Sequence, residues 1–349
     1  MLTSRILRVL LVATLSACGD AATEPTGEPA SSASGDTAAP STPSPGAPSS
    51  TGGGSVTPPP PSGDASTPGP SVPVLPFPSR LFLLPNREMP VSDLGRAIDT
   101  RLGEQPGAVS VIVLVHGRSC GGGGEPKKSL DEAVPELERT MSAAVVLFTW
   151  PGSDEGCPLG FPEARARAAG DALAYLTRVL AAYRATPGAA LGARKVVLLA
   201  HSMGNLVLEA AVGNPSPLPA GVFDTVLVGS SATALSGHAA WLSRAAIGRA
   251  TYVSVNGNDN VLLAAGTGRG TRLGRSIGQE PLAPGVLYAD FGGANVDHAI
   301  HLPSGQKGEG MRAFYRTILR GEPFVVQGAR GVTRTEARGG ATIAFFDGT

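Results

Sequence analysis

The stretch Lys195-Val-Val-Leu-Leu-Ala-His-Ser-Met-Gly-Asn205 decides the fold of this chain. Its first half is an uninterrupted apolar run, which is typical of a strand buried on both faces of a sheet. Residues 205–212 then have a helical pattern and are followed by a glycine. Ser202 therefore lies on a sharp turn between a strand and a helix, with a small residue two positions before it and two after it. Such a turn pushes the serine hydroxyl out of the sheet, toward helix N–H groups that favour developing negative charge.

The rest of the chain predicts a sheet around this turn. Further apolar, β-branched runs predict strands over residues 109–115, 143–148, 225–228, 251–255 and 286–288, besides 196–199. Helical periodicity covers residues 162–186 and 311–320. Alternating strands and helices predict a doubly wound, mostly parallel α/β sheet. Loops beyond the carboxyl ends of such strands carry the chemistry.

The N-terminal segment is predicted to be an export signal outside the fold. Arg5 and Arg8 precede a short apolar run over residues 9–15, and Leu15-Ser-Ala-Cys18 follows. The apolar run is too short for a membrane-spanning helix, which needs about 20 residues. The last four residues resemble the lipobox of bacterial lipoproteins, in which the cysteine is acylated and becomes the mature N-terminus. We therefore expect a lipid anchor on Cys18, and an ordinary secretory signal is the alternative.

Four segments follow from this interpretation. Residues 1–18 are the signal peptide, and residues 19–76, rich in Pro, Gly, Ser and Thr, are a disordered linker. Residues 77–325 form the folded domain, and residues 326–349 are a C-terminal extension of open role, with a hairpin around residues 337–340. Gly19 is not the aspartate that retains lipoproteins at an inner membrane, so the expected location is the cell envelope, with the outer membrane favoured.

Composition excludes several classes of function. The net charge is zero and the chain has no basic runs, which argues against nucleic-acid binding. Neither a His-Glu-x-x-His motif nor paired Cys-x-x-Cys motifs occur, and the glycine-rich stretches do not open a helix after a strand. We therefore expect no metal and no cofactor. The expected partners are a membrane, through the lipid, and a small acyl-ester or lipid-like substrate.

A nucleophilic serine needs a base, and the chain has five histidines. A base is expected after the serine and after the acid, which leaves His298 and His301 in the segment 295–302. His298 is favoured because it lies nearer the preceding strand, between Asp297 and a small residue. His301 is the alternative, at the more typical distance from the last helix. His116 is expected to fix a buried loop, and His238 to be peripheral.

The acid and the oxyanion donors come from other strand ends. Asp259 follows the strand at residues 251–255, between the serine and the histidines in the chain, and is the expected acid. The alternative is that Asp259 only forms the turn, in which case Asp290 or Asp297 is the expected acid. The backbone N–H groups of Met203 and Arg118 are the expected oxyanion donors, the second because Gly117 lets the loop turn sharply.

These residues resemble a known family. Besides the serine turn, the stretches Leu114-Val-His-Gly117, Leu147-Phe-Thr-Trp-Pro151 and Val253-Ser-Val-Asn-Gly-Asn-Asp-Asn-Val-Leu262 carry the resemblance, with a weaker match at residues 81–87. The segment 80–321 resembles α/β-hydrolases and, more narrowly, the bacterial hydrolases known as domain of unknown function 900. The resemblance implies serine-hydrolase chemistry, with Ser202 as nucleophile and Asp259 as acid. The usual sheet order of hydrolases also makes the strands before Cys120 and Cys157 neighbours, so these cysteines are expected to form a disulfide.

The function expected from the sequence is therefore that of a membrane-anchored serine hydrolase, esterase- or lipase-like, acting through an acyl-enzyme. Two alternatives remain open. One is a surface-anchored binding module on a hydrolase scaffold that has lost activity. The other is acyl transfer, which uses the same acyl-enzyme and cannot be separated from hydrolysis by sequence.

Overall fold

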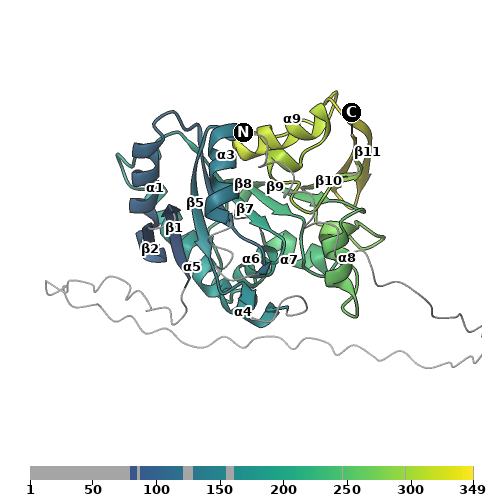
Figure 1. Cartoon of the computed structure of the whole chain (residues 1–349), viewed down its shortest axis with the longest axis horizontal. Coiled ribbons are helices and arrows are strands. Elements are labelled where there is room, and N and C mark those ends of the chain that lie inside the picture. Colours follow the sequence, from purple (N-terminus) through teal and green to yellow (C-terminus); the bar gives the residue numbers. More distant parts are fainter. Residues whose placement is uncertain are drawn as a thin grey trace, which may run out of the picture. The chain divides into compact units, whose positions relative to one another are not determined.

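One large sheet organises the folded part of the chain. The structure, a computed structural model, describes residues 79–84, 87–120, 129–154, 161–245, 247–294 and 296–348. Ten strands lie in the order β11-β12-β10-β9-β8-β7-β3-β5-β1-β2 (Figure 1). The seven strands from β5 to β12 in this order pair in parallel, and β2, β1 and β11 at the two edges pair antiparallel. The predicted doubly wound, mostly parallel α/β fold is confirmed.

The strands of the large sheet are β1 (Arg80–Leu84), β2 (Arg87–Pro90), β3 (Ser110–Val115), β5 (Ala143–Thr149), β7 (Lys195–His201), β8 (Phe223–Gly229), β9 (Gly248–Val255), β10 (Val286–Gly293), β11 (Val332–Arg338) and β12 (Ala341–Asp347). A separate pair is formed by β4 (Ser119–Cys120) and β6 (Ser153–Asp154). The helices are α1 (Leu94–Glu104), α3 (Val134–Met141), α4 (Glu163–Ala168), α5 (Gly170–Arg184), α6 (Gly204–Val212), α7 (His238–Arg244), α8 (Asn260–Gly266) and α9 (Gly308–Leu319). Short helical turns lie at Val91–Asp93, Ser129–Ala133, Leu273–Arg275 and Pro303–Gly305.

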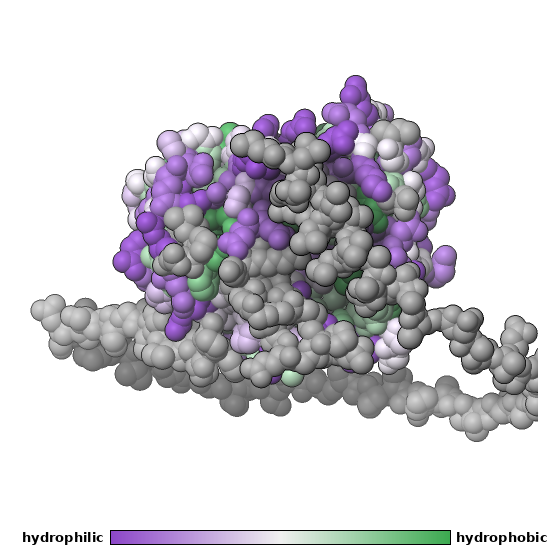
Figure 2. Space-filling view, viewed as in Figure 1, coloured by the Kyte–Doolittle hydropathy of each residue, from purple (hydrophilic) through white to green (hydrophobic). Residues whose placement is uncertain are grey.

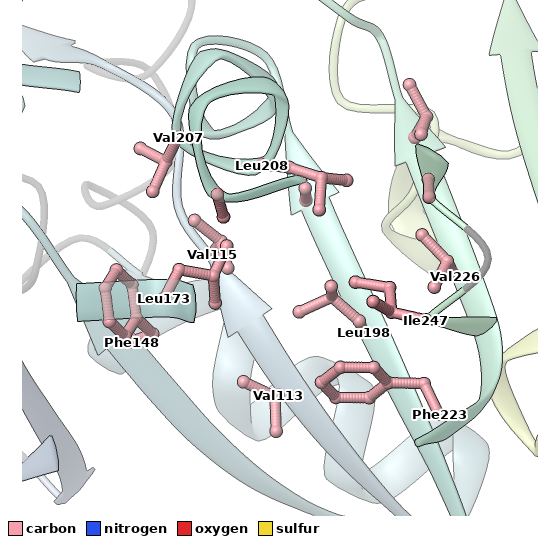
Figure 3. Packing of buried hydrophobic residues seen from close by; sticks show 14 of the residues in the cluster. Val113, Val115, Phe148, Leu173, Leu198, Val207, Leu208, Phe223, Val226 and Ile247 are labelled. Atoms are coloured by element: carbon pink, nitrogen blue, oxygen red, sulfur yellow. The ribbon is translucent and has the colours of Figure 1, made fainter. Parts of the chain in front are cut away.

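The alternation of side chains along the buried strands gives the sheet two apolar faces. In β3, Val111, Val113 and Val115 join one cluster of buried residues, while Ile112 and Leu114 join the other. Helices α1, α5, α6 and α7 cover the first face, and α3 and α9 cover the second (Figure 1). Figure 3 shows the first cluster, where side chains of β3, β7 and β8 meet those of α5 and α6. Burial on both sides explains why these strands read as continuous apolar runs.

The C-terminal hairpin extends the large sheet. Strands β11 and β12 pair antiparallel on either side of Gly339 and Gly340, which confirms the hairpin predicted there. Strand β12 then pairs in parallel with β10. Residues 332–347 are thus part of the same sheet as the other strands of the domain.

Several predictions fall on residues that the structure does not describe. The signal peptide with Cys18, the linker and Cys157 all lie outside the described ranges. None of the helices in those ranges is both long enough and apolar enough to cross a membrane. The coloured surface in Figure 2 is mainly hydrophilic, with smaller hydrophobic areas between the polar ones.

Candidate active site

The turn between β7 and α6 holds Ser202 in a strained conformation. Its φ of 53° is in the left-handed region, where non-glycine residues are uncommon. Gly204 lies so close to the preceding loop that a Cβ there would be 2.5 Å from the carbonyl oxygen of Val115. A small residue at this position is therefore a steric requirement, as the sequence indicated. Strain of this kind persists where the surrounding structure enforces it, and it is concentrated at functional sites.

The loop after β3 lies against Ser202. A Cβ placed on Gly117 would be 2.9 Å from the Cβ of Ser202. His116 is buried, its Nδ1 lies 2.7 Å from the carbonyl oxygen of Gly117, and its Nε2 accepts a hydrogen bond from the backbone N–H of Trp150. Burial lowers the pKa of His116 to about 4, which keeps the ring neutral. The predicted role of His116 as a residue that fixes this loop is confirmed.

Met203 and Arg118, the residues predicted to provide the oxyanion donors, line the same cavity as Ser202. Among the described residues, the backbone N–H of Met203 has no hydrogen-bond acceptor, and it lies at the start of α6. Arg118 follows Gly117 directly and lines the same cavity as Ser202. Its guanidinium lies 5.7 Å from the ring centre of Phe161, another residue of the cavity wall.

Asp259 lies at the start of α8, in the turn that follows β9. One carboxylate oxygen, Oδ1, accepts a hydrogen bond of 2.9 Å from the N–H of Leu262 and so caps the helix. The other, Oδ2, lies 2.7 Å from Nδ1 of His298. The turn-forming role and the role expected of an acid are thus compatible, because the two oxygens point to different partners.

His298 is the histidine that the structure brings to Asp259. Its Nδ1 donates to the carboxylate, which leaves Nε2 as the unprotonated ring nitrogen of the neutral histidine. His298 and Ser202 line the same cavity, but no hydrogen bond joins their side chains within the described residues. Such bonds are often long without substrate and tighten when it binds.

His301 is placed differently. It is 4% exposed, its ring lies 3.9 Å from the ring of His201 between centroids, and its Nδ1 has no partner among the described atoms. Burial, followed by the nearby His298, lowers the pKa of His301 to about 3. Burial also lowers the pKa of His201 well below its usual value. These two rings stay neutral and pack beside His298.

The fallback acids and His238 lie elsewhere. Asp290 accepts a hydrogen bond from the N–H of Gly292, and Asp297 accepts one from the backbone N–H of His298, so neither carboxylate bonds a histidine ring. The expectation that His238 is peripheral is wrong. It is fully buried, and its Nε2 lies 3.1 Å from the hydroxyl of Tyr288, because α7 packs its apolar face on the sheet.

Ser202, Asp259 and His298 therefore follow β7, β9 and β10, in that chain order, at the carboxyl ends of strands in the parallel part of the sheet, where β8 lies between β7 and β9. A serine on a strained strand-to-helix turn, followed in the chain by an acid and then a histidine, is the arrangement of α/β-hydrolases. The chain has the α/β-hydrolase fold.

The chain is similar, at low sequence identity, to several solved structures. A crystal structure of EstE5 soaked with p-nitrophenyl butyrate is 15% identical, covers 62% of this chain and 78% of its own, and has a TM-score of 0.33. An esterase/lipase from an uncultured bacterium is 14% identical over 62% and 78%, with a TM-score of 0.32. An esterase of Pyrobaculum calidifontis is 16% identical over 69% and 68%, with a TM-score of 0.26. No family model and no curated protein matches the chain. The assignment of the fold therefore rests on the order of the strands and on the geometry of the serine turn.

The cavity at these strand ends has a volume of about 370 Å³. Besides Ser202 and the histidines, its wall is largely apolar and includes Leu114, Phe161, Val261, Leu262 and Leu302. Sites for small molecules have volumes of roughly 300–1,000 Å³, with apolar walls and few polar groups, so this cavity is at the small end of that range.

Asn205 is a residue of the site that sequence reasoning did not single out. It is fully buried, and its Nδ2 donates to the carbonyl oxygens of Ala200, Ser202 and Gly229 at 3.0–3.2 Å. These bonds tie the serine turn to the end of β8. The sequence did hold a signal for Asn205, an amide side chain in the first turn of a helix in which Glu209 is the other polar residue.

Proposed function

We propose that this protein is a serine hydrolase that cleaves carboxylic esters through an acyl-enzyme. The observation that carries the proposal is the juxtaposition at one cavity of the strained Ser202 and the Asp259–His298 pair. A nucleophile is expected to have such a base within reach, with a third group that orients the base. The sequence motifs that resemble those of the domain-of-unknown-function-900 hydrolases support the same chemistry.

In the proposed reaction, Oγ of Ser202 attacks the ester carbonyl while Nε2 of His298 takes the hydroxyl proton. Asp259 stabilises the imidazolium that forms, and the N–H groups of Met203 and Arg118 receive the oxyanion. His298 then protonates the departing alkoxide, and the acyl group stays on Ser202. A water molecule, deprotonated by His298, attacks the acyl-enzyme and releases the acid.

The small apolar cavity favours an acyl group of modest size. Val261, Leu262 and Leu302 would contact an alkyl chain and offer it no hydrogen bond. We therefore infer that short-chain esters are better substrates than long-chain ones, whose tails exceed the cavity.

The test is labelling with a fluorophosphonate, which reacts only with an activated serine. Wild-type protein should be labelled, and Ser202→Ala should not be, while Ser231→Ala, a change of another buried serine, should be labelled normally. Absence of labelling in folded wild-type protein would favour the non-catalytic binding module. If the protein is labelled but an added alcohol receives the acyl group in preference to water, it is an acyltransferase.

We also propose that the domain is held at the cell envelope by a lipid on Cys18, with the outer membrane favoured. The support is the lipobox-like stretch ending at Cys18 and the long spacer that follows it. Metabolic labelling with an alkyne fatty acid should mark wild-type protein and should fail with Cys18→Ser. A Cys18→Ser protein that still fractionates with membranes would refute the anchor.

A further inference from the structure

The loop that carries His298 is held by side chains from two other strand ends. The hydroxyl of Ser230 donates to the carbonyl oxygen of His298 at 2.8 Å. Nδ2 of Asn256 donates to the carbonyl oxygen of Val296 at 2.8 Å, with a longer contact of 3.5 Å to that of Asp297. Three consecutive carbonyls of the loop are thus bound by two side chains, and both of these residues are fully buried.

The position of Ser230 is itself fixed by its backbone conformation and by a hydrogen bond to a neighbouring strand. It is the first residue after β8, and its φ of 42° is unusual for a residue other than glycine. Its N–H donates to Oγ of Ser254 in β9 at 3.1 Å. The hydrogen bond to β9 therefore holds Ser230 in the conformation in which its hydroxyl reaches the carbonyl oxygen of His298.

The same turn also holds the nucleophile. The N–H of Ser202 donates to the carbonyl of Gly229 at 3.0 Å, and the N–H of Ala232 donates to the carbonyl of Ser202 at 3.2 Å. Ser230 lies between these two contacts in the chain. Its hydroxyl therefore links the position of the base to that of the serine.

Asn256 links the position of His298 to that of Asp259. It is the first residue after β9, and its carbonyl accepts a hydrogen bond of 3.1 Å from the N–H of Asp259. Its Oδ1 accepts from the N–H of Asn258 at 3.0 Å. One side of Asn256 thus shapes the turn that carries Asp259, and its Nδ2 holds the loop that carries His298.

We propose that Ser230 and Asn256 are positioning residues, which set the base His298 relative to the nucleophile and the acid through the backbone of residues 296–298. This inference rests on the proposed function. Neither residue contacts the reacting atoms. Small errors of position at a reaction centre can lower the rate by about 10²-fold for 1 Å, so the effect on turnover is expected to be large.

Two substitutions remove the donors with little change of shape. Ser230→Gly removes the hydroxyl and tolerates the positive φ without strain. Asn256→Asp keeps an oxygen for the N–H of Asn258 but replaces the Nδ2 donor by an acceptor. Ser231→Ala is the matched control, because its buried hydroxyl bonds Thr233 and has no contact with the loop.

The first measurement is turnover of p-nitrophenyl acetate by the full-length protein, with thermal unfolding recorded for each variant. Ser230→Gly and Asn256→Asp should each lower kcat by about 10- to 100-fold, with KM within about twofold of wild type. Ser231→Ala should match wild type. If Ser230→Gly fails to fold, Ser230→Ala is measured in its place, and if Asn256→Asp fails to fold, Asn256→Ala is measured in its place.

The second measurement does not depend on activity. The proton shared by Nδ1 of His298 and Asp259 should give a far-downfield proton resonance, assigned by its absence from His298→Ala. That resonance should shift or broaden in Ser230→Gly and Asn256→Asp and stay in place in Ser231→Ala. Unchanged kcat, or an unchanged resonance in folded variants, overturns the positioning role. Wild-type protein that shows the resonance but takes no fluorophosphonate refutes the proposed function alone, since the resonance still reports the position of the base.

Discussion

Asp259 and His298 are joined by a hydrogen bond of 2.7 Å between a fully buried carboxylate oxygen and a ring nitrogen of a side chain that is 15% exposed. In the neutral ring this bond places the proton on Nδ1 and leaves Nε2 as the nitrogen that can accept a proton, as the proposed reaction requires. Because the second oxygen of Asp259 caps α8, the orientation of the acid is set by secondary structure.

The two functions of Asp259 should separate on substitution. Asn is as good a helix cap as Asp, so Asp259→Asn should change the free energy of unfolding by less than about 0.5 kcal/mol. Its amide would present a donor to Nδ1 of His298 and favour the wrong tautomer, which should lower kcat about 10⁴-fold. Asp259→Ala should lose activity similarly and also about 1 kcal/mol of stability. Urea unfolding measures the change in stability, and ester turnover measures the change in kcat. Equal loss of stability in the two variants would contradict the view that capping and catalysis are separate functions of Asp259.

Substitution of His298 and of His301, one at a time, tests which of them is the base. His298→Ala should abolish reaction with fluorophosphonate. His301→Leu, which keeps the volume of a buried ring without its nitrogens, should retain most of the labelling rate, because His301 lies on His201 and has no bond to Asp259. Rates of labelling at one probe concentration are sufficient. If His301→Leu is inert while His298→Ala reacts, the base is His301.

Local patterns predicted much of this structure, and long-range contacts explain what they missed. The serine turn depends on residues adjacent in the chain, such as Gly204, whose lack of a side chain is required by the approach of the loop after β3. The six strands predicted from apolar runs all form, because each is buried by helices on both faces.

The base could not be decided from sequence, because His298 and His301 lie in one short segment with similar neighbours. What separates them in the structure is the hydrogen bond of His298 to Asp259, which comes from another part of the chain, whereas Nδ1 of His301 has no partner among the described residues. His238 was misjudged for a similar reason. Its alanine-rich surroundings look peripheral, but Tyr288, fifty residues later, provides a buried hydrogen-bond partner.

Buried neutral histidines should make the fold sensitive to mild acid. Burial holds the pKa of His116 at about 4 and that of His301 at about 3, whereas an unfolded histidine titrates near 6.5. The unfolded chain therefore binds more protons below pH 6.5, so the stability that is fully present above this pH falls as pH decreases toward about 4. Each such histidine contributes about 1.4 kcal/mol per pH unit well below 6.5.

The control for this pH dependence is His301→Leu, which removes one of these buried histidines. Between pH 6 and pH 5, the decline in the free energy of unfolding, measured in urea, should be less steep for this variant than for wild type. Identical slopes would show that His301 is not held neutral by the fold.

The C-terminal hairpin should be required for stability, although sequence left its role open. Phe346 in β12 is 2% exposed and meets the rings of Phe291 and Phe314 at centroid distances of 4.7 Å and 5.4 Å. Phe346→Ala should therefore cost about 3–5 kcal/mol in the free energy of unfolding, because it leaves a cavity among packed aromatic side chains.

The neighbouring residue provides the control for Phe346. Phe345 points to the other face of β12, is only partly buried and is covered by the guanidinium of Arg334 at 3.8 Å. Phe345→Ala should cost no more than about half as much, since less apolar surface is lost from a protein interior. Urea unfolding of the two full-length variants compares them directly. A loss below about 1 kcal/mol for Phe346→Ala would mean that the hairpin adds little stability, and equal losses in the two variants would mean that the burial of Phe346 among the aromatic rings is not what stabilises it.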